Sequence, residues 1–125
     1  QMCIRDSRTP FKAAWHPLQG CWGQYCTQIT GNYLFHSSPY NSPNKNDLSY
    51  RLYNQLGTVC SHGCVRLTVA DAKWIYDNCP LGTTVSIYNA SSLPVPKPSA
   101  PWLDISSPNR GWDPTDPDPA NPWNK

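Results

Sequence analysis

Two short runs rich in β-branched and aromatic residues, 25–29 and 33–36, flank the polar triplet Thr30-Gly31-Asn32. Runs of this composition bounded by turn residues are typical of paired strands, and Gly31 can adopt the positive φ that a tight turn needs. The pattern therefore predicts a β-hairpin over 25–36. Residues 37–48 follow with two prolines, three asparagines and three serines, a composition that predicts a loop or lid.

A helical periodicity begins after Thr68, which is a good N-cap with Asp71 three residues on as its capping-box partner. Apolar side chains then recur on one helical face: Val69, Ala72, Ile75 and Tyr76. We expect this helix to stop at Asn78-Cys79-Pro80, because proline cannot continue it.

Weaker signals complete the domain. Residues 83–88 alternate in the manner of a half-buried strand, and residues 52–56 fit a short helical turn that Gly57 ends. Residues 8–19 are interrupted by Pro10 and Pro17, so we expect a loop there.

The character of the chain changes after Asn89. Residues 91–125 hold most of the fourteen prolines and few aliphatic side chains, so they offer little apolar area to offset the ordering of their backbone. We expect a disordered, proline-rich, low-complexity tail, with Trp102, Trp112 and Trp123 as scattered anchors.

Composition bounds the function. At 125 residues the chain has room for one domain. A net charge of +2 is too weak a bias to argue for nucleic acid or an anionic membrane as a partner, and neither is expected. No run approaches the roughly 20 apolar residues of a membrane span, and no signal peptide is visible. Residues 1–7 resemble a translated sequencing-adaptor tag, so we interpret them as an assembly artefact and expect natural upstream sequence to be missing.

Six cysteines raise the question of disulfides or a metal site. Cys21 and Cys26 flank four residues and could close a small loop in an oxidising compartment, so their pairing stays open. The spacing of Cys60, Cys64 and Cys79 lacks the close C-x-x-C pairs of a structural zinc site, and no metal is expected.

The strongest chemical signal is the segment Ser61-His62-Gly63-Cys64-Val65-Arg66-Leu67. A thiol with a pKa near about 8.5 is mostly protonated at neutral pH, so a nucleophilic cysteine needs a base, for which His36 and His62 are candidates. Gly63 permits a sharp backbone path that lets amides converge on an oxyanion, and the N-terminus of the following helix would favour negative charge nearby. Taken singly, a cysteine or histidine is more often structural; the joint pattern favours catalysis.

Residues 61–67 resemble the active-site signature of the L,D-transpeptidase catalytic domain, the YkuD-like family. The stretches 68–76, 82–88 and 20–26 are similar to members from Firmicutes, so the resemblance covers about residues 8–90. It implies a mainly β, sandwich-like fold with one or two short helices, with the early strands absent here.

The resemblance also implies roles for single residues. Cys64 attacks the substrate, His36 is the general base and His62 shapes the site. Gly63 and Cys64 supply oxyanion-hole amides. Ser61 is a polar support and Arg66 holds a substrate carboxylate. The 25 positions between His36 and Ser61 exceed the usual spacing, so residues 37–55 would loop out as a lid. His16 is a rival base that we interpret as structural.

The implied function is cross-linking of peptidoglycan stem peptides through a cysteine thioester, without a cofactor, in the extracytoplasmic cell wall of a bacterium. A membrane would be involved only through a missing N-terminal anchor. Two alternatives stay open: an L,D-carboxypeptidase that passes the thioester to water, and a noncatalytic wall-binding module built on the tryptophans and the tail.

Overall fold

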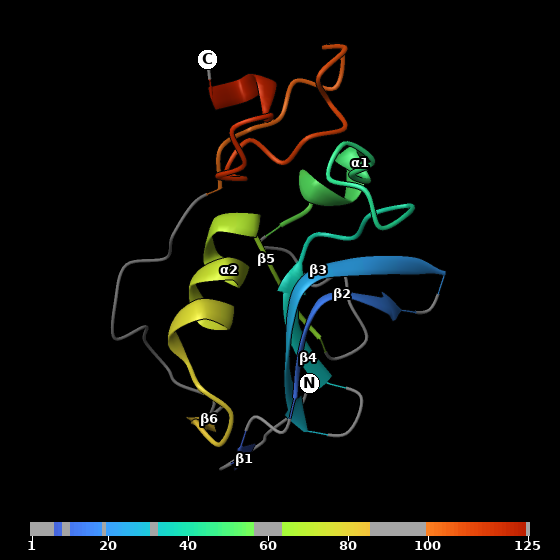
Figure 1. Cartoon of the computed structure of the whole chain (residues 1–125). Helices are drawn as coiled ribbons and strands as arrows, with labels where there is room; N and C mark the ends of the chain where they lie inside the picture. Colours follow the sequence, from blue (N-terminus) through green and yellow to red (C-terminus); the bar gives the residue numbers. More distant parts are fainter. Residues whose placement is uncertain are drawn as a thin grey trace, which may run out of the picture.

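The computed structural model describes residues 7–8, 11–18, 20–30, 33–56, 64–85 and 100–124 (Figure 1). The described chain is mainly β, as expected, with a mixed four-stranded sheet, a separate two-stranded sheet and two helices. The elements in chain order are β1 (Ser7–Arg8), β2 (Lys12–Leu18), β3 (Cys21–Thr30), β4 (Tyr33–Ser37), α1 (Tyr50–Tyr53), β5 (Val65–Leu67), α2 (Val69–Asn78), β6 (Thr84–Val85) and a 3-10 turn (Pro122–Asn124).

The four-stranded sheet has the order β2-β3-β4-β5. The predicted hairpin is confirmed as the antiparallel pair β3-β4, and β5 joins β4 in parallel. The expected loop over 8–19 is wrong, because β2 pairs with β3 along most of its length. Pro17 misled the prediction: it lies in a strand at the end of the sheet order, where a missing N–H costs no ladder bond on the open side.

The predicted helix is confirmed as α2, with Thr68 at its N-cap and the Thr68 hydroxyl accepting from the Asp71 amide at 3.3 Å. The helix ends before Cys79 and Pro80 as expected. The shorter elements also lie close to their predicted places. α1 begins two residues before the expected turn, and β6 falls inside 83–88, of which residues 86–88 lie outside the described part.

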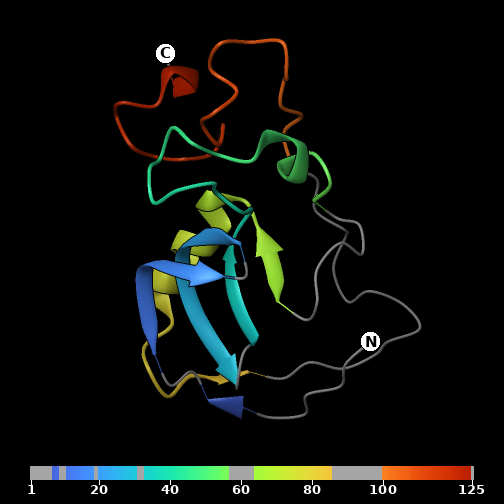
Figure 2. The ribbon, with the colours of Figure 1, turned by 90° about the vertical axis from the view of Figure 1, so that its right-hand side faces the viewer.

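Helix α2 covers one face of the four-stranded sheet, and Figure 2 looks onto the opposite face with α2 behind. Tyr25 of β3 packs on Tyr76 of α2 with ring centroids 5.3 Å apart. The main apolar cluster lies toward the top of Figure 1, where the sheet, α1 and α2 meet the end of the chain. Its buried members are Tyr40, Leu48, Tyr53, Val69 and Leu103.

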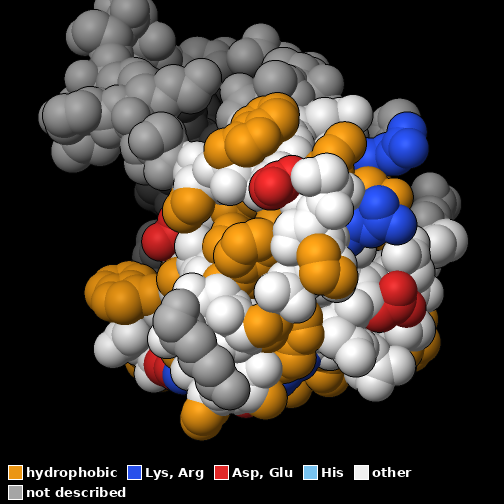
Figure 3. Space-filling view, turned by 90° about the horizontal axis from the view of Figure 1, so that it is seen from above, with side chains coloured by type: hydrophobic (Ala, Val, Ile, Leu, Met, Phe, Trp, Pro, Cys, Tyr) orange, Lys and Arg blue, Asp and Glu red, His pale blue; other side chains and the backbone are white. Residues whose placement is uncertain are grey.

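Residues 100–124, here called the C-terminal segment, pack on this cluster, so the expected disorder of 91–125 is wrong for them. Leu103 is 1% exposed, and its backbone N–H and C=O both bond the Asn54 side chain, at 3.0 and 2.9 Å. Trp123 packs against the cluster and donates to the Asn109 carbonyl, whereas Trp102 is 78% exposed. Seen from this side, hydrophobic side chains lie among polar and charged ones (Figure 3).

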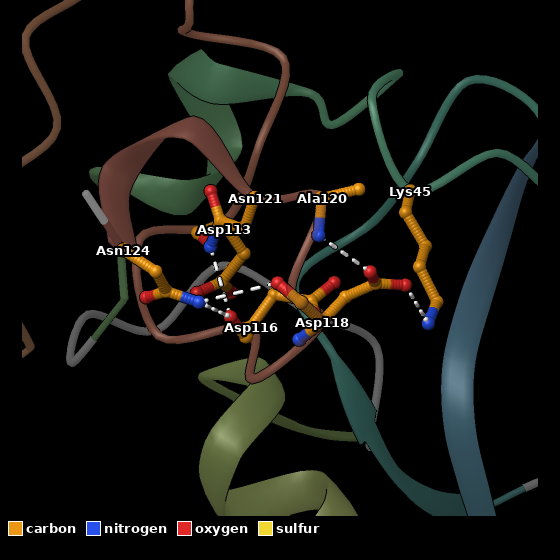
Figure 4. Close-up of polar contacts among 7 residues, drawn as sticks. All are labelled: Lys45, Asp113, Asp116, Asp118, Ala120, Asn121 and Asn124. Carbon is orange, nitrogen blue, oxygen red and sulfur yellow. Dashed lines mark hydrogen bonds and ion pairs between the residues drawn. The ribbon is translucent and has the colours of Figure 1, made fainter.

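Polar side chains hold the segment together in place of aliphatic ones. Along it, an Asp or Asn oxygen repeatedly accepts from the backbone N–H two residues later, at Asp104, Asp113, Asp116, Asp118 and Asn121. The buried side-chain amide of Asn121 also donates to the carbonyls of Asp113 and Asp116 (Figure 4). Lys45, in the loop between β4 and α1, forms an ion pair with Asp118 at 2.7 Å. Such turns give backbone N–H groups hydrogen-bond partners within the segment. A prediction of disorder based on the number of apolar residues does not take these bonds into account.

The segment also caps α2. The Asp113 carboxylate accepts from the Val69 amide at 3.0 Å, and the Thr115 hydroxyl accepts from the Ala70 amide at 3.0 Å. Together with Thr68, these side chains satisfy the first three amides of the helix, which have no partner within it.

Candidate active site

Strand pairing brings the predicted site residues together. In the parallel pair β4-β5, His36 lies opposite Arg66, and Cys64 directly precedes β5. Residues opposite one another in a sheet share a face, and so do residues two apart in an extended chain. The long connection between His36 and Cys64 therefore does not separate them, because His36 lies in β4 and Cys64 directly precedes the neighbouring strand β5.

The imidazole of His36 is buried, with the residue 2% exposed. Its Nδ1 bonds the Ser37 carbonyl at 2.5 Å. A carbonyl oxygen can only accept, so Nδ1 carries the proton and the neutral ring presents the lone pair of Nε2 as a base. Sequence reasoning missed this carbonyl, because every residue carries a backbone carbonyl and no residue type marks it.

Burial lowers the pKa of His36 to about 4, against the opposing effect of the Ser37 hydrogen bond, and the charge of Arg66 lowers it further. The ring is thus neutral at physiological pH. The unprotonated Nε2 of a neutral imidazole can accept a proton from a thiol or an amine, and the lowered pKa makes it a weaker base than an ordinary histidine.

Two further thiols lie within electrostatic reach of Cys64. Burial raises the pKa of Cys26 to about 12, with the charge of Cys64 adding to the effect and the His16 backbone N–H opposing it. Burial also raises the pKa of Cys21, which the charge of Arg66 lowers and that of Cys64 raises. Cys21 and Cys26 are free thiols in this structure.

The amides at the N-terminus of α2 are engaged within the chain. The first three bond the side chains of Asp113, Thr115 and Thr68. Burial raises the pKa of Asp113, against the opposing hydrogen bonds from Thr115 and Val69. The expected dipolar assistance of this helix to Cys64 stays a prediction.

The other members of the signature, Ser61, His62 and Gly63, lie outside the described residues, as does Cys60. Their predicted roles stay predictions. His16, the rival base, lies in β2 opposite Gly23, with its ring 5.3 Å from that of Phe11. Within the described part of the chain, no group of three His, Cys, Asp or Glu side chains could hold a metal ion. None of the helices described is long and apolar enough to cross a membrane.

The chain matches a known protein family over more than half of its length. The model of the L,D-transpeptidase catalytic domain, YkuD, matches residues 5–87. The chain therefore belongs to the L,D-transpeptidase catalytic domain family, which confirms the resemblance found in residues 61–67.

A curated relative, "Putative L,D-transpeptidase YciB" of Bacillus subtilis, is 47% identical over 57 residues, which make up 46% of this chain and 28% of the relative. A crystal structure of a fused Zn-dependent amidase/peptidase/peptidoglycan-binding domain-containing protein from Clostridium acetobutylicum superposes with a TM-score of 0.49 at 34% identity. The match covers 70% of this chain and 34% of that one. The chain thus spans about a third or less of each relative.

Proposed function

We propose that this chain is a peptidoglycan L,D-transpeptidase in which Cys64 forms a thioester with a stem peptide and His36 is the base. The observation that carries the proposal is a buried, neutral imidazole with an unprotonated Nε2. His36 pairs with β5, the strand that Cys64 directly precedes. Family membership supports the reaction class.

In the first step, His36 Nε2 takes the proton of the Cys64 thiol as the sulfur attacks the carbonyl carbon before the terminal D-alanine of a tetrapeptide stem. The backbone amides of Gly63 and Cys64 receive the oxyanion. The C–N bond then breaks, the His36 proton passes to the departing amine, and D-alanine leaves behind a thioester.

In the second step, a side-chain amine of a neighbouring stem attacks the thioester. His36 accepts the proton of that amine, the C–S bond breaks, and the proton returns to the sulfur. The sum is one amide broken and one formed, with D-alanine released, so neither a metal nor an organic cofactor is consumed.

Arg66 binds a substrate carboxylate in this scheme. Arg66 pairs with His36 across β4 and β5, and its positive charge lowers the pKa of His36. A fixed positive charge thus acts on the base. A planar guanidinium suits a bidentate carboxylate. We expect Arg66→Lys to raise KM for the stem peptide more than it lowers kcat.

Ser61 and His62 support the site in the proposal, the one as a polar group and the other by shaping the hydrogen-bond network. The substrate resides in the cell wall, so the proposed location is extracytoplasmic.

The test uses a synthetic tetrapeptide stem ending in D-alanine, with mass spectrometry of the protein and of the products. We expect a Cys64 acyl-enzyme, release of D-alanine and formation of dimers. Cys64→Ala should abolish all three, and His36→Gln should lower acylation by about 10²–10⁴-fold with little change in binding. The matched control is Cys79→Ala, which removes a free thiol beyond the end of α2 and should leave acylation unchanged.

The products separate the alternatives. Trimmed stems without dimers identify a carboxypeptidase. Wall binding that survives in both Cys64→Ala and His36→Gln, with no acyl-enzyme in the parent chain, identifies a binding module and refutes the enzyme. An equal loss of acylation and affinity in His36→Gln means that the base has been assigned to the wrong residue.

A further inference from the structure

Gly23 of β3 lies against the base of the proposed site. A Cβ built on Gly23 would stand 2.9 Å from the Cys26 sulfur and 3.2 and 3.3 Å from Cβ and Cγ of His36. Carbon and sulfur atoms in contact stand farther apart than this, so any side chain at 23 would force a neighbour to move. The backbone of Gly23 does not adopt a positive φ, unlike that of Gly20 and Gly82. Glycine is therefore required at 23 by space and not by conformation.

The backbone of β3 is distorted at this point. Tyr25 has φ 53°, a left-handed conformation that is disfavoured for a residue with a side chain. Tyr25 lies between Gly23 and Cys26, which are three positions apart and would point to opposite faces of a regular strand. The turn of the backbone at Tyr25 accounts for the Cys26 sulfur lying where a side chain of residue 23 would be.

Cys26 contributes shape and not reactivity at this place. The residue is 0% exposed, its sulfur accepts from the His16 backbone N–H, and its pKa is raised to about 12. A buried thiol of this kind behaves as a small apolar group. Gly23 and Cys26 thus form a wall on the β3 side of the imidazole, while the Ser37 carbonyl holds Nδ1 from β4.

These contacts restrain His36 in two ways. The hydrogen bond to Ser37 fixes which nitrogen carries the proton, and the wall limits how far the ring can move toward β3. We propose that Gly23 and Cys26 are positioning residues that set the location of the His36 imidazole relative to Cys64. The proposal rests on the proposed role of His36 as the base. It extends that role to two residues of β3 that the active-site signature does not include.

The test is Gly23→Ala, alone and combined with Cys26→Ala, measured as the rate of Cys64 acylation by the tetrapeptide stem across pH. With contacts of 3.2 and 3.3 Å, the methyl group should displace the ring by a few tenths of an ångström. Because a misplacement of about 1 Å can lower a rate by about 10²-fold, we expect this smaller shift to lower kcat by about three- to tenfold with little change in KM. Removing the sulfur at 26 takes away the closest contact, so the double variant should regain a substantial part of the lost rate.

Gly20→Ala is the matched control. Gly20 has φ 76° and nothing within 4 Å of its built Cβ. Gly20→Ala therefore strains the backbone of the turn between β2 and β3 without touching His36. It should lose stability but keep the acylation rate. The NMR titration of His36 gives a second readout: a ring pushed out of its buried site should titrate closer to the ordinary histidine range in Gly23→Ala and not in Gly20→Ala.

The outcomes separate this inference from the proposed function. If Cys64→Ala retains acyl transfer, the proposed function fails whatever the glycine variants do. If Cys64 is essential but a folded Gly23→Ala acylates at the parent rate, or the double variant is no faster than the single one, the positioning role is refuted. If Gly23→Ala does not fold, recovery of folded, active protein in the double variant supports the role, and failure to recover it overturns the role.

Discussion

Replacing Asp113 by alanine tests whether the C-terminal segment is part of the catalytic domain's folding unit. Asp113 and Val69 are both fully buried, and one carboxylate oxygen of Asp113 accepts a hydrogen bond from the Val69 amide. The other oxygen accepts from the Thr115 amide and hydroxyl at 2.8 and 2.6 Å.

The expected cost follows from these contacts. Asp113→Ala leaves the Val69 amide at the start of α2 without an acceptor, and a buried amide in that state costs about 1–3 kcal/mol. We therefore expect Asp113→Ala to lower the free energy of unfolding by about 1–3 kcal/mol, a large share of the roughly 5–15 kcal/mol of an ordinary domain. Asp113→Asn retains an acceptor for the Val69 amide and should cost less.

Urea unfolding followed by tryptophan fluorescence measures the change. Asp104→Ala is the matched control, because Asp104 makes the same local turn with the Ser106 amide and hydroxyl but is exposed, and its side chain has no hydrogen bond to a helix among the described residues. It should cost far less than Asp113→Ala. Equal losses in the two variants, or a protein cut after residue 99 that unfolds at the parent urea concentration, would refute the capping role.

Two further predictions concern buried polar groups. Because the folded pKa of His36, about 4, lies below the ordinary 6.5, the stability that its neutral form contributes is complete above pH 6.5 and is lost as the pH falls toward 4. At about 1.4 kcal/mol per pKa unit the loss approaches about 3 kcal/mol, and the difference in unfolding free energy between the parent and His36→Gln across this range measures it. The buried Tyr40 hydroxyl has no hydrogen-bond partner among the described residues, whereas the Tyr53 hydroxyl donates to the Pro101 carbonyl at 2.9 Å. Tyr40→Phe should therefore be neutral or stabilising while Tyr53→Phe costs about 1 kcal/mol in the same urea assay, and the reverse order would contradict the assignment of these contacts.

Local sequence patterns were sufficient to predict the β3-β4 hairpin and the helix α2. Two β-favouring runs close together in the sequence form the pair β3-β4, and Thr68 with Asp71 begins an amphipathic stretch that forms α2. Both depend on contacts between residues near one another in the chain. The His-Gly-Cys signature and His36 as a candidate base also came from the sequence, since residue types carry their own chemistry.

Contacts between different elements were decided by the tertiary structure alone. The strand position of Pro17, the capping of α2 by the C-terminal segment and the space that excludes a side chain at Gly23 depend on contacts between elements. These contacts join β2 to β3, Asp113 to Val69 44 positions away, and Gly23 to His36 of β4. The neutral state of the His36 imidazole, which burial imposes, also depends on the tertiary structure. Periodicity and composition report what a residue prefers. Burial, the space around a side chain and the partner of a backbone amide are set by whatever the rest of the folded chain brings beside it, and no local pattern encodes that.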